Sequence, residues 1–242
     1  MMDGVVGRYM GSIDEALKAF RKGIPVLIYD SGDREDEVDY VVYGGAVDTD
    51  IIYEMRTVAG GLICYAMGRE AARALGIPFA SDYLQKVEPL SKLVKMPRYG
   101  EPPAFSVWVN HISVVTGIRD IDRATTIREL HVVSKLVYEG NVEKAKQKFY
   151  EEFMAPGHVP ILVERSLRVR RGHTELSLAL ARLSGVTPSA ALVEMLVRGR
   201  QLTYEEALRV SREYGYPLVK GDDIVEEVVK RMGPPQLGAR PP

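Results

Sequence analysis

The segment IPVLIYDSGDREDEVDYVVYGG, residues 24–45, decides the fold and also holds the most unusual feature of the chain. It begins with an apolar run of strand length, IPVLIY, and ends with a second strand-like run, VDYVVYGG, which predicts a β-hairpin or two neighbouring strands. Between them, one arginine, Arg34, is surrounded by six acids: Asp30, Asp33, Glu35, Asp36, Glu37 and Asp39. Carboxylates this close repel one another and raise one another's pKa, so the cluster requires a cation or strong hydrogen-bond donors among them.

Outside this segment, strand-like and helical patterns alternate along the chain. Ser12 to Arg21 is amphipathic and opens with a capping box, Ser12-x-x-Glu15, and Thr203-x-x-Glu206 repeats that signal late in the sequence. Further helices are expected over 49–59, 69–75, from near Ala124, over 144–153, after the turn at 170–173, over 203–214 and over 222–232; further strands are expected at 62–66, 105–110, 160–164 and 191–197. No Gly-rich phosphate loop is present, which argues against a nucleotide cofactor. The pattern predicts an α/β (α+β) fold, a single domain with a mixed β-sheet flanked by helices.

Four segments are expected to lack regular secondary structure or a packed face. Residues 78–103 gain Pro, Gly and Lys and are predicted to be mostly loop, and APGHVP, residues 155–160, is predicted to be a rigid turn. The helix over 144–153 is expected to face solvent. The last ten residues, 233–242, are expected to be a disordered tail after a single domain over 1–232, with its core at about 8–200 and C-terminal helices over 203–232.

Composition narrows the class of protein. With 32 basic and 33 acidic residues the formal net charge is −1, so no general basic field draws the chain to nucleic acid or to an anionic membrane. No apolar run approaches the roughly 20 residues that a membrane span needs, and no secretory signal pattern is visible. A single cysteine, Cys64, excludes an intramolecular disulfide and a multi-cysteine zinc site. A soluble, cytoplasmic protein is expected.

The histidines supply the second set of candidate groups. His111 and His131 are predicted to be structural or exposed, whereas His158 and His173 follow glycine in tight turns. Arginine, threonine and the free N–H groups of a helix start at RRGHT would suit a phosphate ester, although a solvated basic turn would have the same pattern. The acidic segment alone could equally be a charged, solubilising hairpin turn. Together, a glutamate and a histidine could hold a hard divalent cation that neutralises the acids and assists enolisation of a ketose.

Several motifs occur in the order and approximate spacing of one enzyme family: DSGDREDEVD, GGLICYA, TGIRDIDRATTI, APGHVP, RVRRGHTE and the late Glu194. Over about residues 8–200 the chain resembles 3,4-dihydroxy-2-butanone 4-phosphate synthase of riboflavin biosynthesis. The resemblance implies a carbon–carbon lyase that converts ribulose 5-phosphate to 3,4-dihydroxy-2-butanone 4-phosphate and formate. It also implies Mg²⁺ or Mn²⁺, no organic cofactor, and a homodimer with active sites at or near the subunit interface.

The resemblance also assigns roles to individual residues. Glu35 and His173 would bind the metal. Glu37, Asp39, His158 and Glu194 would be catalytic. The substrate would be bound by Arg34, Glu35, Asp39, Cys64, Thr116, Arg170, Gly172, His173, Thr174 and Glu194.

Three positions depart from the family pattern. Ser31 replaces the second aspartate of D-D-x-D-R-E-x-E-G-D, Val38 replaces its glycine, and PGHVP lacks the usual Phe after PGHV. Ser31 removes one negative charge from the acidic cluster that would transfer protons. Val38 lacks the conformational freedom that glycine would give the backbone at this position. With one cysteine and about 40 residues after Glu194, the chain is expected to stand alone, without the GTP cyclohydrolase II module fused to some relatives.

Two other interpretations fit parts of the pattern. A metal-dependent aldolase or epimerase that acts on a pentulose phosphate would need a similar acidic site and a similar phosphate-binding site. Only the synthase releases formate. A ligand-binding or assembly module that has lost catalysis would explain Ser31 and Val38, but retention of the other motif residues speaks against it. Metal-dependent turnover would separate such a module from an active enzyme.

Overall fold

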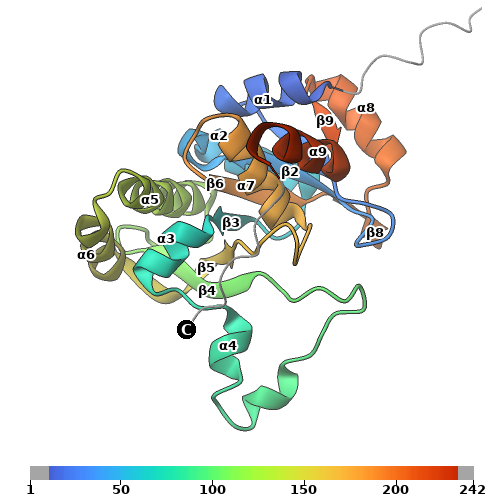
Figure 1. Ribbon diagram of the computed structural model, residues 1–242. Helices are drawn as coiled ribbons and strands as arrows, with labels where there is room; N and C mark the ends of the chain where they lie inside the picture. The colour runs from blue at the N-terminus through green and yellow to red at the C-terminus, as the bar shows by residue number, and fades with distance from the viewer. Residues whose placement is uncertain (1–10, 234–242) are drawn as a thin grey trace, which may run out of the picture.

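The computed structural model describes residues 11–233, which form a layered α/β structure around a mixed sheet (Figure 1). The sheet has seven strands in the order β4-β5-β3-β6-β2-β1-β9. The strands are β1 (Val26–Tyr29), β2 (Val38–Tyr43), β3 (Cys64–Met67), β4 (Phe105–His111), β5 (Phe153–Val163), β6 (Ser189–Glu194) and β9 (Leu218–Lys220). The β5/β3 and β1/β9 pairs are parallel and the other four are antiparallel, so the predicted fold class is confirmed.

Helices cover both faces of this sheet because its strands are apolar on both sides. One core packs α1 (Ile13–Arg21), α7 (His173–Leu183) and α9 (Gly221–Met232) on the face that contains Val26 and Ile28. The other core lies on the face of Leu27 and Tyr40. Its helices are α2 (Thr49–Glu54), α3 (Arg69–Leu75), α5 (Asp120–Tyr138), α6 (Val142–Glu152) and α8 (Tyr204–Tyr214). Burial of successive β1 residues on opposite faces explains why IPVLIY is continuously apolar.

Local signals in the sequence set most element boundaries. Both predicted capping boxes form, at Ser12 and Thr203. The strands β1 and β2 pair as an antiparallel hairpin with Tyr29 opposite Val38, as residues 24–45 predict. The helix expected over 49–59 begins after Asp48 and changes to a π-helix over Met55–Ala59 before Gly60 ends it in the left-handed region.

The prediction that APGHVP forms a turn is wrong, because these residues belong to β5. Between Val109 and Asn110 of β4, the partner on β5 jumps from Val159 to Met154, so the Pro and Gly residues form a bulge within the strand. A Cβ on Gly157 would lie 1.9 Å from the carbonyl carbon of Val109. Glycine is therefore required for the two backbones to approach, and the sequence signal for a turn marks a bulge.

Several element boundaries and short elements differ from the sequence predictions. Residues 78–103 contain α4 (Ala80–Leu84) and a 3₁₀ turn at Leu90–Leu93, and project from the body of the protein (Figure 1). Helix α5 begins at Asp120 rather than near Ala124, and α6 buries Ala145 and Phe149 rather than lying wholly in solvent. The strand expected over 191–197 is divided between β6 and the short β7 (Leu196–Val197), and neither β9 nor β8 (Arg200–Gln201) was expected. The predicted tail lies outside the described residues except for Gly233.

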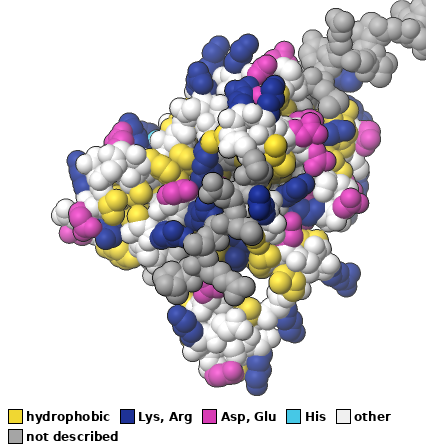
Figure 2. Space-filling model, in the orientation of Figure 1, with side chains coloured by type: hydrophobic (Ala, Val, Ile, Leu, Met, Phe, Trp, Pro, Cys, Tyr) yellow, Lys and Arg dark blue, Asp and Glu magenta, His cyan; other side chains and the backbone are white. Residues whose placement is uncertain are grey.

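Two surface properties follow the sequence. Basic and acidic side chains are interspersed over the visible face, as expected for a net charge of −1 (Figure 2). Within residues 11–233, no helix combines the length and the apolar character needed to cross a membrane.

Candidate active site

The acidic residues gather where β1 ends, β2 begins and β6 ends, beside the start of α7. Asp39 on β2 lies directly opposite Glu194 on β6 in the antiparallel register. His173 is the first residue of α7, and Cys64 begins β3. Residues separated by up to 164 positions in the chain thus meet at one edge of the sheet.

Asp30 organises the acidic loop. Its Oδ1 accepts a hydrogen bond from the backbone N–H of Glu37 at 2.9 Å, and its Oδ2 accepts from the N–H of Glu35 at 3.1 Å. Asp36 adopts φ +55°, so the one left-handed position of the loop is at Asp36, and Val38 is a fully buried strand residue. The missing family glycine therefore imposes no strain at Val38 itself.

Arg34 lies among these carboxylates with a side chain only 6% exposed. Its Nη1 contacts Asp30 Oδ2 at 2.9 Å and also Glu35, and its Nε donates to Glu101 at 2.6 Å. Its Nη2 is buried and has no hydrogen-bond partner among residues 11–233. An unpartnered buried donor is costly, so Nη2 is a group that a bound oxygen would satisfy.

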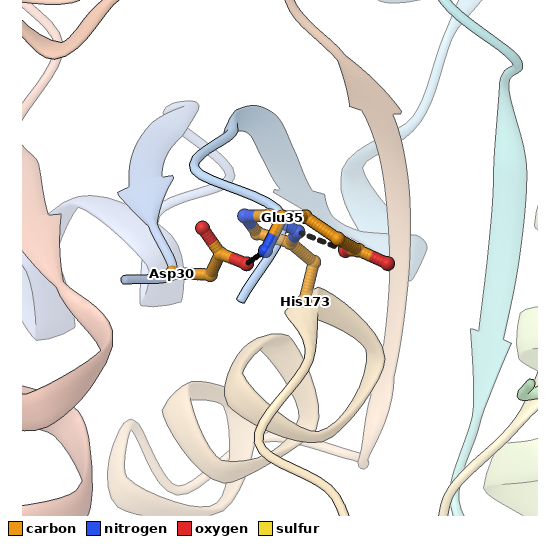
Figure 3. A group of neighbouring side chains, drawn as sticks. All are labelled: Asp30, Glu35 and His173. Atoms are coloured by element: carbon orange, nitrogen blue, oxygen red, sulfur yellow. Dashed lines mark hydrogen bonds and ion pairs between the residues drawn. The ribbon is translucent and has the colours of Figure 1, made fainter. Parts of the chain in front are cut away.

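His173 presents one nitrogen to the acids, as Figure 3 shows with its labelled neighbours Asp30 and Glu35. Nε2 lies 3.1 Å from the carbonyl oxygen of Ile28, and because a carbonyl only accepts, Nε2 must carry the proton. The Nδ1 lone pair of the neutral ring then faces Asp39 Oδ1 at 3.5 Å and Glu35 Oε2 at 3.9 Å. Burial lowers the pKa of His173, which favours this neutral form.

The carboxylates deepest in the cluster have raised pKa values. Burial, followed by the charges of Glu194 and Glu37, raises the pKa of Asp39 well above its ordinary value. Burial, followed by the charge of Glu35, raises the pKa of Glu37 to about 7. A carboxyl group that exchanges its proton near neutral pH, beside a second one whose pKa is also raised, suits acid and base catalysis. Burial also raises the pKa of the Cys64 thiol, so Cys64 lines the site as a neutral group.

The RRGHT turn places a second arginine beside this cluster. Arg170 is 7% exposed and its Nη1 pairs with the fully buried Glu175, while its Nε has no hydrogen-bond partner in the described part of the chain. Gly172 is the N-cap of α7, and a Cβ there would lie 2.2 Å from the Arg170 guanidinium. Gly172 therefore leaves the space that the Arg170 guanidinium occupies. Thr174 is buried in the first turn of the same helix.

The residues present fit a divalent cation. Ligand atoms of Asp30, Glu35 and His173 all lie within 4.8 Å of one another. A buried Asp39 Oδ1 without a hydrogen bond faces the Nδ1 lone pair, an arrangement that only a proton or a cation between them would stabilise. Because Asp30 already accepts two backbone bonds, Glu35 and His173 are the better candidates for ligands, and the Ile28 carbonyl would orient the imidazole.

Two predicted site residues lie elsewhere. The backbone N–H of His158 donates to Asn110 Oδ1 at 2.8 Å, and its ring contacts the same amide. Thr116 donates to Asp122 at 3.0 Å, in the loop that follows β4. Among residues 11–233 no hydrogen bond or ion pair joins either residue to the acidic cluster.

Comparison with known proteins agrees with this geometry. Residues 14–227 match the family model of 3,4-dihydroxy-2-butanone 4-phosphate synthase. The chain belongs to the 3,4-dihydroxy-2-butanone 4-phosphate synthase family. A synthase of Archaeoglobus fulgidus is 42% identical over 227 residues, covering 90% of this chain and 94% of that protein. A synthase of Methanosarcina mazei is 38% identical over 226 residues, covering 89% and 90%.

A solved structure of a 3,4-dihydroxy-2-butanone 4-phosphate synthase in complex with two magnesium ions has the same fold. Its TM-score is 0.73 at 28% identity, with 92% of this chain and 98% of that chain covered. The resemblance inferred from the motifs is therefore confirmed. Riboflavin synthesis proteins named RibBA match at lower identity, and this chain covers 48% of the Thermotoga maritima example.

Some residues of this synthase-family site have no signal in the sequence. Tyr99 and Glu101 come from the segment predicted to be loop, and Arg34 stacks over the Tyr99 ring at 4.8 Å. Glu175, the last residue of the motif RVRRGHTE, supports Arg170, and Asn110 supports His158, but the sequence predicted no role for either residue. Only their tertiary contacts identify them.

Proposed function

We propose that this chain is a 3,4-dihydroxy-2-butanone 4-phosphate synthase that converts ribulose 5-phosphate to 3,4-dihydroxy-2-butanone 4-phosphate and formate. One observation carries the proposal most directly: the unprotonated Nδ1 of His173 faces Glu35 and Asp39, with the unpartnered donor of Arg34 beside the same carboxylates. This arrangement combines a cation site, a proton-transfer group and an anion donor, which are the three functions that enolisation of a ketose phosphate needs.

Each residue then has a distinct task. Arg170 and the free N–H groups at the start of α7 would hold the phosphate, and Arg34 Nη2 would bind a substrate oxygen. Glu37 and Asp39 would take and return protons, beginning with the C3 proton, and Glu194 would act beside Asp39. A divalent cation, Mg²⁺ or Mn²⁺, held by Glu35 and His173 would polarise the substrate carbonyl and hydroxyls. Loss of the C1 hydroxyl, skeletal rearrangement, hydration and release of C4 as formate complete the reaction.

A homodimer would complete the site. Among residues 11–233, neither His158 nor Thr116 hydrogen-bonds the acidic cluster of its own chain, and both belong to the region of β4, β5 and the start of α5, where apolar side chains are exposed. These side chains are Phe105, Trp108, Ile112, Val115, Ile118, Ile121 and Met154. An apolar surface of this kind is typical of a subunit interface. A second copy that covers it would bring its own His158 and Thr116 to this chain's acids.

The test is incubation of the purified protein with ribulose 5-phosphate and Mg²⁺, with formate followed by NMR, with and without a chelator. Metal-dependent formate release is expected. Glu35→Ala and His173→Ala should abolish it while the protein remains folded. Turnover of ribulose 5-phosphate to an isomer or to cleavage products without formate would reject the synthase in favour of an epimerase or aldolase.

A dimer test uses mixed variants. His158→Ala and Glu35→Ala should each be inactive alone, and subunit exchange between them should restore roughly a quarter of the wild-type activity in a random mixture of equal parts. Absence of any recovery, with exchange verified by mass, would contradict a site shared between subunits.

A further inference from the structure

Residues 78–103, which project from the body of the protein (Figure 1), are called the excursion here. The last part of the excursion, which leads back to β4, passes over the acidic loop. Within residues 99–104, Tyr99 lies under the Arg34 guanidinium, and Glu101 contacts both Arg34 and the start of α7. Pro103 accepts a hydrogen bond from Arg165 Nη2 at 3.1 Å, and the Ala104 carbonyl accepts from the N–H of Val163 at 2.8 Å. We call residues 99–104 the strap, because they connect the acidic loop, the residues before α7 and the end of β5.

Glu101 makes two different contacts with its two carboxylate oxygens. Oε2 accepts from Arg34 Nε at 2.6 Å, and Oε1 accepts from the backbone N–H of Arg171 at 3.2 Å. The first is a charge-assisted bond to a side chain that is almost completely buried. The second ties the acidic loop to the residue that precedes Gly172, the N-cap of α7. Glu101 thus couples the two anion-binding parts of the site.

The remaining contacts of Arg34 show what Glu101 contributes. A guanidinium is planar and presents its five N–H donors in a fixed fork. Asp30 and Glu35 occupy Nη1, while Nη2 is buried without a partner. Glu101 holds the opposite edge at Nε, so the plane of the guanidinium and the direction of Nη2 are both fixed. Without Glu101, the arginine could turn to pair another edge with the remaining carboxylates.

We propose that Glu101 is a positioning residue for the synthase reaction: by holding Arg34 Nε and the start of α7 together, it aims Arg34 Nη2 at the substrate. This inference rests on the proposed function, because it takes Arg34 to be a substrate-binding residue. In this proposal Glu101 acts through Arg34 rather than by touching substrate or cation itself. Tyr99 supports the same orientation from the face of the guanidinium.

The experiment compares Glu101→Gln and Glu101→Ala with Glu88→Gln as the matched control. Glu88 belongs to the same excursion, but within residues 11–233 its carboxylate accepts a hydrogen bond only from the nearby Ser91 hydroxyl at the surface. Loss of a group that orients a functional side chain typically lowers activity by roughly 10- to 100-fold. We expect this loss in kcat/KM for both Glu101 variants, no loss for Glu88→Gln, and melting temperatures within a few degrees of wild type.

Rescue separates positioning from a structural role. The Glu101 side chain is 23% exposed, so acetate can enter the space left in Glu101→Ala and accept from Arg34. Acetate should restore activity to Glu101→Ala and not to Glu101→Gln, whose amide fills that space; chloride at equal ionic strength should restore neither. Wild-type kcat/KM in both variants would overturn the proposal, and so would a lower KM, since that would mean that Glu101 competes with the substrate phosphate.

A second readout does not depend on turnover. Lys95 and Arg98 are exposed just before the strap, on the excursion that projects at the bottom of Figure 2. If Glu101 fastens the strap, trypsin should cut after these residues faster in Glu101→Ala than in wild type or Glu88→Gln. Equal cutting rates would overturn the anchoring role of Glu101. A wild-type protein that releases no formate would reject the proposed function, whereas active variants beside an active wild type would reject only this inference.

Discussion

Removal of the His173 imidazole should remove most of the thermal stabilisation that Mg²⁺ gives the wild-type protein. His173 is 4% exposed, and its Nδ1 faces two carboxylates at 3.5 and 3.9 Å. Without a cation, the Nδ1 lone pair and these acids are kept together only by retained protons, which the raised pKa of Asp39 reflects. A bound divalent cation would replace those protons and stabilise the folded state alone, because the unfolded chain does not hold Glu35 near His173.

The expected size follows from linkage between binding and folding. At Mg²⁺ about 100 times its Kd, binding to the folded state adds about 2.7 kcal/mol to the free energy of unfolding. For a chain of this length 1 kcal/mol shifts the melting temperature by about 2–4 °C, so the wild-type shift should be about 5–10 °C. Loss of a protein ligand should weaken binding by about 100-fold or more. At the same Mg²⁺ concentration His173→Ala should then gain about 0.4 kcal/mol or less, a shift of about 1–2 °C.

The assay is thermal unfolding followed by circular dichroism, with Mg²⁺ or with chelator, in a mildly alkaline buffer. His158→Ala is the matched control, because His158 is exposed and hydrogen-bonds Asn110 rather than the acids. It should keep the full Mg²⁺-dependent shift while losing formate release. The quantity compared is the shift within each protein, so any general destabilisation by the substitution cancels. An equal shift in His173→Ala and wild type would refute the assignment of His173 as a ligand.

Three further predictions concern the same site. The metal-free protein should lose stability as pH rises between about 4.5 and about 7, because the folded state holds the Glu37 proton more tightly than the unfolded chain does; denaturation with urea should show a weaker pH dependence in Glu37→Gln. Glu175→Gln should lower the free energy of unfolding by about 3 kcal/mol or more, since it leaves the buried Arg170 charge without its partner, and unchanged urea stability would contradict that pairing. Gly172→Ala should raise KM for ribulose 5-phosphate in steady-state kinetics, because its Cβ would displace the Arg170 guanidinium; an unchanged KM would mean that Arg170 does not hold the phosphate.

Local patterns predicted the elements that depend on neighbouring residues. The capping boxes at Ser12 and Thr203 and the β1/β2 hairpin depend on residues a few positions apart, so the sequence carries their full description. The prediction of a turn at APGHVP was wrong. Pro and Gly indicate an unusual backbone conformation, but they do not indicate which strand the segment packs against. Here the neighbouring residue is Val109 of β4, which makes the segment a bulge in a strand.

The features of the site likewise divide into those that the sequence predicted and those that only the tertiary structure shows. The sequence by itself determined that the acids of residues 30–39 need a cation or donors, and the family resemblance of its motifs predicted that Glu35 and His173 would hold such a cation. Only the tertiary structure decided which His173 nitrogen faces the acids, since the Ile28 carbonyl that fixes the tautomer is 145 positions away. The same holds for Glu101, which is 67 positions from Arg34 and lies in a segment without periodicity. Residue type and spacing encode local conformation and chemical capacity, but hydrogen bonds between distant segments depend on packing of the whole chain.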